Sequence, residues 1–305
     1  MKKDLLTIND LTVKEIQELF SLTDKLKKNK AKFGKTLFGK TLVLIFQKPS
    51  NRTRVSFEVG MFQLGGNSLY LAPNEINLGI RESIADVART LSRYVDGIVI
   101  RTFEHKNCLE LAKEATVPVI NGLSDFSHPC QALADLYTVK EKLKVLKGLT
   151  LAYVGDGNNV CNSLLFICAK LGVNMNVGCP KGYEPDAAVL KDAKAAAEAS
   201  GAGINLFNDA FSAVKAADVI YTDVWASMGQ EDEAAKRKEA FRGFQVNKNL
   251  VESAKANVLI MHCLPAHRGE EITDDVLNSQ NAVIFDEAEN RMHVQKAVLI
   301  KLLGR

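Results

Sequence analysis

The segment Ser50–Arg54 (Ser-Asn-Arg-Thr-Arg) concentrates hydrogen-bond donors directly after the apolar run Leu42–Phe46. Pro49 disfavours helix at the residue before it, and Ser50 is a favourable helix N-cap. The backbone amides of residues 51–53 are then expected to point outward at a helix N-terminus. Such amides, the helix dipole and a nearby guanidinium favour an anion, most naturally phosphate. The alternative is a capped helix start whose arginines pair with surface carboxylates.

A second polar segment, His128-Pro129-Cys130-Gln131, opens a predicted helix after another strand and loop. His128 and Gln131 are three residues apart, so both side chains can face one ligand from a single helical turn. An imidazole can donate to a carbonyl oxygen, and a glutamine oxygen can accept from an amino group. A structural helix cap is the alternative interpretation.

The glycine-rich turn Gly155–Asn159 (Gly-Asp-Gly-Asn-Asn) invites a dinucleotide-binding interpretation, which its details exclude. Val160 occupies the third glycine position, and the next strand ends in Gly178-Cys179-Pro180 without an acidic residue for a ribose. The sequence therefore argues against a Rossmann dehydrogenase. Asn158 and Asn159 are instead expected at the edge of the sheet, where they can meet a polar ligand.

Two further polar segments follow predicted strands. Asp223 offers a carboxylate for an amine, and residues 227–229 (Ser-Met-Gly) are expected to form a mobile lid. The alternative is a surface loop with Asp223 as a helix cap. In the second segment, adjacent strand residues point to opposite faces, so His262 is poorly placed to activate Cys263 as a nucleophile. His267 stays open for that role, and a buried, inert cysteine is the alternative.

Strands and helices alternate along the chain, and the polar segments stand where strands end. Predicted strands are 41–46, 68–71, 97–101, 117–121, 149–154, 174–178, 204–207, 219–222, 258–261 and 282–285. Predicted helices are 11–28, 55–64, 83–94, 107–115, 129–143, 162–171, 187–199 and 290–303. This order predicts an α/β fold of two doubly wound parallel-sheet domains, with the active site in the crevice between them. The expected domains are residues 1–144 and 145–286, with a C-terminal helix at 287–305 packing back on the first.

Composition narrows the function classes. The chain is 47% hydrophobic and 25% charged, as in a soluble globular protein, and its net charge is only +3. No basic stripe interleaved with aromatic residues suggests nucleic acid. No apolar run approaches the roughly 18 residues of a membrane span, and the N-terminus does not read as a secretion signal. The six cysteines form no CxxC pair and no metal-ligand spacing, which indicates reduced, mostly buried thiols in a cytoplasmic protein.

Taken together, the motifs closely resemble the aspartate/ornithine transcarbamylase family and its ornithine branch, from about Thr41 to Arg291. The family's Ser-Thr-Arg-Thr-Arg signature stands at residues 50–54, with Asn51 in place of the first threonine. His-Pro-x-Gln stands at 128–131. The ornithine branch adds Asp-x-x-x-Ser-Met-Gly, at 223–229, and His-Cys-Leu-Pro, at 262–265.

The resemblance implies a carbamoyl-phosphate-binding first domain and an ornithine-binding second domain. The residues it places on carbamoyl phosphate are Ser50, Asn51, Arg52, Thr53, Arg101, His128, Gln131, Cys263, Leu264 and Arg291. Those it places on ornithine are Asn159, Asp223, Ser227 and Met228. Catalytic roles fall to Cys263, Arg101 and His128, whereas Arg54 is expected to be a structural ion-pair partner.

The implied reaction is attack of the neutral δ-amine of L-ornithine on the carbamoyl carbon, which gives L-citrulline and phosphate. It requires no metal, cofactor or covalent intermediate, because orientation and charge stabilisation supply most of the rate. One hypothesis is that Cys263, as a thiolate near cationic groups, accepts or helps to hold the proton of the amine. Both directions of the reaction, in arginine biosynthesis or breakdown, share this chemistry.

Alternatives remain within and outside the enzyme class. N-acetylornithine and putrescine are other candidate acceptors, aspartate is disfavoured by the segment 227–229 and Cys263, and a non-catalytic carbamoyl-phosphate-binding protein is conceivable on the same fold. The family assembles homotrimers or multiples of trimers. Relatives reach into a neighbouring subunit's site with a Gln or His where this chain carries the shorter Asn77. No nucleic acid or membrane partner is expected.

Overall fold

The computed structural model describes residues 1–226 and 231–304. Ser227 and Met228, both expected at the ornithine site, therefore lie outside the described residues. None of the described helices is both long and apolar enough to cross a lipid bilayer.

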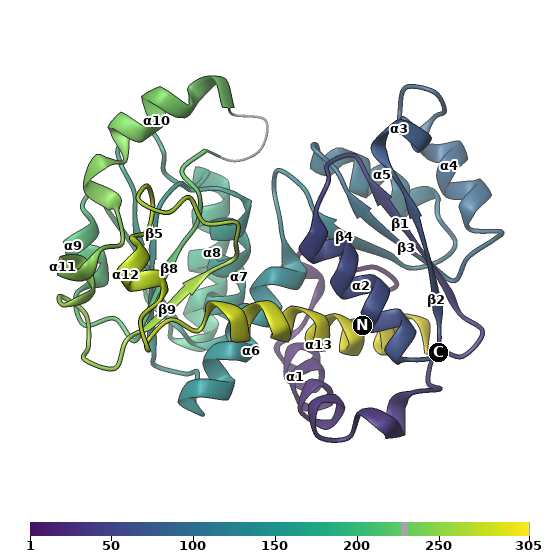
Figure 1. Cartoon of the computed structure of the whole chain (residues 1–305), viewed down its shortest axis with the longest axis horizontal. Coiled ribbons are helices and arrows are strands. Elements are labelled where there is room, and N and C mark those ends of the chain that lie inside the picture. The colour runs from purple at the N-terminus through teal and green to yellow at the C-terminus, as the bar shows by residue number, and fades with distance from the viewer. Residues whose placement is uncertain (227–230, 305) are drawn as a thin grey trace. The chain divides into compact units, whose positions relative to one another are not determined.

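The chain divides into two compact units (Figure 1). Unit 1 comprises Met1–Ala134 and Glu289–Arg305, and unit 2 comprises Asp135–Ala288. The divisions fall inside two long helices, α6 (Pro129–Leu143) and α13 (Ile284–Leu303). Each unit has its own all-parallel sheet, so the expected α/β fold with two doubly wound domains is confirmed.

In unit 1 the strand order is β2-β1-β3-β4. The strand β1 is apolar and buried from Leu42 to Phe46, because parallel strands covered by helices are buried on both faces. Its Val43 and Ile45 pack with α4 and α5, so Leu44, between them, faces the opposite side of the sheet. The elements are η1 (Ile8–Asp10), α1 (Val13–Lys28), η2 (Lys30–Phe33), β1 (Thr41–Phe46), α2 (Asn51–Gln63), β2 (Asn67–Leu71), α3 (Pro73–Ile76), α4 (Ile84–Leu91), β3 (Gly97–Arg101), α5 (His105–Glu114) and β4 (Val119–Leu123).

In unit 2 the strand order is β7-β6-β5-β8-β9. The strand β5 lies at the centre and leads directly into α7, a helix buried from Asn159 to Ala169. The elements are β5 (Thr150–Val154), α7 (Asn159–Leu171), β6 (Asn174–Gly178), α8 (Ala187–Ser200), β7 (Ile204–Phe207), α9 (Ala210–Val214), β8 (Val219–Thr222), η3 (Glu231–Glu233), α10 (Ala234–Ala240), η4 (Arg242–Phe244), α11 (Lys248–Val251), β9 (Leu259–His262) and α12 (Asp274–Leu277).

One predicted strand is wrong. Residues 282–285 form no strand: Ala282 makes only an isolated bridge to Ile260, and α13 begins at Ile284. The apolar run Ala282–Phe285 has the composition of a short strand, but in the structure it leads into the first turn of a 20-residue helix. A run of four apolar residues cannot distinguish a short buried strand from the start of a buried helix.

Candidate functional site

The segment Ser50–Arg54 opens helix α2 at the carboxyl end of β1, as predicted. Ser50 is its N-cap, and the Ser50 side chain accepts a hydrogen bond from the Thr53 amide at 3.3 Å. The Asn51 side chain accepts from the Arg52 amide at 2.7 Å. The expectation that all three amides are free is therefore wrong, because two of them already donate to neighbouring side chains. An anion arriving here would exchange with those local acceptors.

Arg291, on α13, gathers three predicted site residues in unit 1. Its guanidinium donates to Thr53 Oγ1 at 3.3 Å and to Gln131 Oε1, and it lies 3.5 Å from His128 Nε2. The Arg291 side chain and all three partners are buried. We call Thr53, His128, Gln131 and Arg291 the guanidinium group. It brings together residues from α2, α6 and α13.

Two more arginines act on this group through their charge. Burial, and then the positive charges of Arg291, Arg101 and Arg52, hold the pKa of His128 well below 6.5. His128 is therefore a neutral imidazole that keeps one N–H donor. The buried Arg101 ends β3 in the same sheet. Three cations around a neutral ring make a site suited to an anion that also carries a carbonyl oxygen.

We expect the His128 ring to stay neutral as the pH falls from 8 through 6.5 in two-dimensional NMR of the histidine rings, with the resonance assigned through His128→Gln. Below about pH 6.5 the unfolded chain takes up a proton at this position whereas the folded chain does not. His128 should therefore make the fold lose stability as the pH falls below 6.5, and His128→Gln should remove that part of the loss. A ring that titrates near pH 6.5 would contradict this assignment.

In unit 2, Asp223 and Cys263 lie side by side at the carboxyl ends of β8 and β9. The Cys263 thiol donates to Asp223 Oδ1 at 3.0 Å, and the Val224 amide donates to the same oxygen at 2.8 Å. The side-chain nitrogen of Asn158, Nδ2, donates to Asp223 Oδ2 at 2.8 Å. We call Asn158, Asp223 and Cys263 the carboxylate group. It offers a buried carboxylate to a cationic or amine ligand.

The idea of a Cys263 thiolate near cationic groups is wrong for this structure. Burial and the adjacent Asp223 carboxylate raise the pKa of the Cys263 thiol well above 9.0. The charge next to the sulfur is an anion, and a neighbouring negative charge disfavours the thiolate. Cys263 is therefore a hydrogen-bond donor here and not a base.

The His262 ring shapes the turn after β9. Its Nδ1 accepts from the Leu264 amide at 2.8 Å, and its Nε2 lies 3.0 Å from Glu271 Oε1. Leu264 has a left-handed backbone with φ +59°, followed by a cis bond to Pro265. Both ring nitrogens of His262 are thus engaged away from Cys263, as the strand alternation predicted. His267, the other candidate, is half exposed and lies 3.7 Å from Glu270.

Sequence reasoning missed a buried carboxyl pair, Asp135 and Glu287. Glu287 accepts from Tyr221 Oη at 3.3 Å and from the His262 amide at 3.1 Å. Burial, and then Asp135, raise the pKa of Glu287 well above 4.5. Both carboxyls lie in long helices outside any motif, α6 for Asp135 and α13 for Glu287, so no local pattern in the sequence marked them as a pair.

The remaining predicted residues are placed as follows. Asn159 is buried in the first turn of α7. Arg54 pairs with Glu58 at 3.0 Å, which confirms the expected ion pair, and its guanidinium lies 3.8 Å from the centre of the Tyr70 ring. Asn77 adopts a left-handed conformation with φ +42° and donates to the carbonyl of Asn74.

Potential metal ligands gather in two places within residues 1–226 and 231–304. One set is Asp223, His262 and Cys263, and the other is His267, Glu270 and Glu271. In the first set His262 already uses both ring nitrogens, and the thiol and the carboxylate bond each other. A metal would have to displace these bonds, so the residues present fit a hydrogen-bonded site better than a metal centre.

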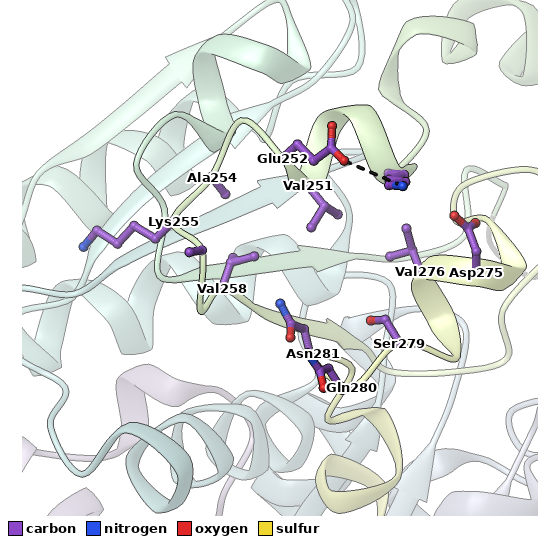
Figure 2. A pocket seen from close by; sticks show the side chains of 12 residues that line it. Val251, Glu252, Ala254, Lys255, Val258, Asp275, Val276, Ser279, Gln280 and Asn281 are labelled. Atoms are coloured by element: carbon purple, nitrogen blue, oxygen red, sulfur yellow. Dashed lines mark ion pairs between the residues drawn. The ribbon is translucent and has the colours of Figure 1, made fainter.

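Unit 2 also contains a pocket of about 470 Å³. Figure 2 shows the side chains that line it. Val251, Val258 and Val276 line it, and none of the predicted site residues does. Its lysines have acidic neighbours: Lys255 lies 2.6 Å from Asp218, and Lys248 lies 4.0 Å from Glu252. The pocket therefore offers little uncompensated charge to a ligand.

Comparison with known proteins identifies the family. Residues 3–141 match "Aspartate/ornithine carbamoyltransferase, carbamoyl-P binding domain", and residues 147–302 match the "Asp/Orn binding domain" of that family. The ornithine carbamoyltransferase of Pyrococcus horikoshii is 58% identical over 305 residues, covering 99% of this chain and 96% of the relative. The anabolic ornithine carbamoyltransferase of Pyrococcus furiosus is 57% identical with the same coverage.

A solved structure agrees with these matches. The ornithine carbamoyltransferase from Pyrococcus furiosus superposes with a TM-score of 0.96 at 56% identity, covering 99% of this chain and 97% of that one. Fold, motif order and nearly full-length identity thus point the same way. The chain belongs to the aspartate/ornithine carbamoyltransferase family.

Proposed function

We propose that this carbamoyltransferase transfers the carbamoyl group of carbamoyl phosphate to the δ-amine of L-ornithine, giving L-citrulline and phosphate. The observation that carries the proposal is the guanidinium group, in which Arg291 draws Thr53, His128 and Gln131 together beside two further arginines. A phosphate needs such cations, and a carbamoyl oxygen needs a neutral donor. The Pyrococcus relatives are named for the same activity.

In unit 1, we assign the phosphate to the α2 N-terminus, with Ser50, Asn51, Arg52 and Thr53. Arg101 and the N–H of neutral His128 would polarise the carbamoyl oxygen, so that negative charge developing there meets fixed donors. Gln131 would exchange its bond to Arg291 for one to the carbamoyl amino group. Arg291, released from Gln131, would keep its positive charge for carbamoyl phosphate.

In unit 2, we assign the amine groups of ornithine to the Asp223 carboxylate, with Asn159, Ser227 and Met228 as further contacts. The attacking δ-nitrogen forms a bond to the carbamoyl carbon, and the bond from that carbon to the phosphate oxygen breaks. The phosphate leaves with the electron pair of the broken bond, and the nitrogen passes one proton to that departing phosphate. Cys263 and the Leu264 carbonyl would orient the amine, with the thiol acting as a neutral donor.

The test offers carbamoyl phosphate with ornithine, N-acetylornithine, putrescine and aspartate in separate assays for ureido product. Citrulline from ornithine, with little product from the others, is the expected result. Product only from another amine would keep the carbamoyl site and overturn the assignment of Asp223. Binding of carbamoyl phosphate without turnover of any acceptor would favour a non-catalytic binding protein.

Assembly and location belong to the same proposal. The face of α2 carrying Val55, Val59 and Phe62 is apolar, and these side chains are 53%, 36% and 81% exposed. Spaced by four and three residues, they form one stripe, which a second copy of the chain would cover. We therefore propose a homotrimer or a multiple of trimers, and light scattering that gives a monomer mass would overturn it.

The six cysteines are free, and five are buried. Free thiols are usual in a reducing compartment, so we place the enzyme in the cytoplasm. The name of the Pyrococcus furiosus relative supports a role in arginine biosynthesis. Recovery of the protein in an oxidising compartment, with these cysteines paired, would contradict this location.

A further inference from the structure

Asn158 links the first turn of α7 to the carboxylate of Asp223. Its Oδ1 accepts from the amides of Val160 and Cys161 at 2.9 and 3.1 Å, as expected of a helix N-cap. Its Nδ2 donates to Asp223 Oδ2 at 2.8 Å. The cap explains the contacts of the oxygen only. The contact of the nitrogen lies outside the helix and reaches 65 residues along the chain.

The orientation of the Asn158 amide is determined by its surroundings. Tyr153 Oη lies 3.2 Å from Oδ1, which therefore faces three donors. Tyr153 is fully buried, and burial raises the pKa of its phenol well above 10, so the hydroxyl keeps its proton. If Oδ1 and Nδ2 were exchanged, the N–H groups of Nδ2 would face the Tyr153 hydroxyl and the amides of Val160 and Cys161, which are all donors. Nδ2 must then face Asp223.

The bonds around Asp223 leave one direction open to a ligand. An ionised carboxylate offers about four acceptor positions, two on each oxygen. Among residues 1–226 and 231–304, Oδ1 receives the Val224 amide and the Cys263 thiol, and Oδ2 receives only the Asn158 side chain. The remaining acceptor position is therefore on Oδ2, the oxygen that Asn158 holds.

We propose that Asn158 is a positioning residue: its amide holds Asp223 so that the open lone pair of Oδ2 points at the ornithine amine. This inference rests on the proposed function, and it adds a residue that contacts Asp223 and not the substrate. Without the donor, only the two bonds to Oδ1 resist rotation of the carboxylate, and Oδ2 can bind water in several orientations. Both changes weaken the binding of an amine in one geometry.

The test replaces Asn158 by serine, which is as good an N-cap but whose hydroxyl is too short to reach Asp223 while it caps α7. We expect kcat/KM for ornithine to fall by about 10- to 100-fold, the effect of losing a hydrogen bond to a charged group. KM for carbamoyl phosphate and the melting temperature should stay at the wild-type values. The matched control is Asn247→Ser, the same change at the N-cap of α11. It should leave kcat/KM for ornithine and KM for carbamoyl phosphate unchanged.

A double-mutant cycle with Asp223→Asn separates positioning from a general structural role. If Asn158 acts through Asp223, Asn158→Ser should have little further effect once Asp223 has lost its charge. Equal losses in both backgrounds would overturn the proposal, as would a melting temperature that falls together with the activity on both substrates. A wild-type protein that makes no citrulline would refute the proposed function itself, whereas an active wild type with an unimpaired Asn158→Ser variant would refute only the role of Asn158.

Discussion

Replacing Arg291 by methionine is expected to lower kcat/KM for carbamoyl phosphate by about 100- to 1,000-fold, the usual effect of removing a donor that stabilises developing charge. Arg291 contacts each of the other three members of the guanidinium group, Thr53, Gln131 and His128. Methionine keeps much of the buried volume but removes the charge and the fork of donors. Steady-state kinetics with carbamoyl phosphate varied at saturating ornithine measures the loss.

The same variant has a second readout. Because the charge of Arg291 helps to hold the pKa of His128 down, Arg291→Met should move that pKa upward, although burial still keeps it below 6.5. Arg291→Lys should restore part of the charge effect on His128 but not the bidentate contacts. Arg54→Met is the matched control, since Arg54 pairs with Glu58 away from the guanidinium group. A loss in Arg291→Met no larger than that in Arg54→Met would refute the assignment.

Replacing Asp223 by asparagine is expected to lower kcat/KM for ornithine by about 100-fold or more, with little change in KM for carbamoyl phosphate. The change keeps the shape of the side chain but removes the charge that an amine would pair with. Losing one member of a buried, hydrogen-bonded charge pair at a binding site has effects of this size. The new amide nitrogen also faces a donor whichever oxygen it replaces, because the Cys263 thiol donates to Oδ1 and the Asn158 side chain donates to Oδ2.

Thiol chemistry gives an independent measurement for the same variant. The Asp223 charge raises the pKa of Cys263, so Asp223→Asn should lower that pKa and allow alkylation of Cys263 at a lower pH. Burial remains, so the pKa stays above its ordinary value. Asp209→Asn, at the N-cap of α9, is the control, since Asp209 bonds the Ser212 amide and has no bond to Cys263. An unchanged pH dependence of alkylation would show that Asp223 does not control the thiol.

Local patterns predicted most of the elements correctly. The strands Thr41–Phe46, Gly97–Arg101 and Asn174–Gly178 begin and end at the predicted residues. Each is a short apolar run bounded by polar or turn residues, and its signal lies within a few positions of the chain. The N-cap Ser50 is also confirmed, because a cap bonds amides only two or three residues away.

The errors arise where a local pattern is silent or where tertiary packing overrides it. The predicted range 55–64 omits the first turn of α2, which begins at Asn51 directly after the Ser50 cap, because polar residues in a first turn carry no apolar periodicity. Residues 282–285 lead into helix α13 and not into a strand. The prediction of a Cys263 thiolate is wrong for a related reason. A pKa depends on the charges packed around a group, and the charged neighbour of Cys263 is Asp223, 40 residues away in the sequence.

The sequence by itself determined the order of strands and helices, the two-sheet architecture and the residue types available at each strand end. Only the tertiary structure decided which of those residues meet. Arg291 reaches Gln131 across 160 residues and Thr53 across 238. Asp223 receives Asn158 from 65 residues away. Backbone preferences act between neighbours in the chain, whereas these pairings depend on strand order and helix packing, which bring distant segments together as the core is buried.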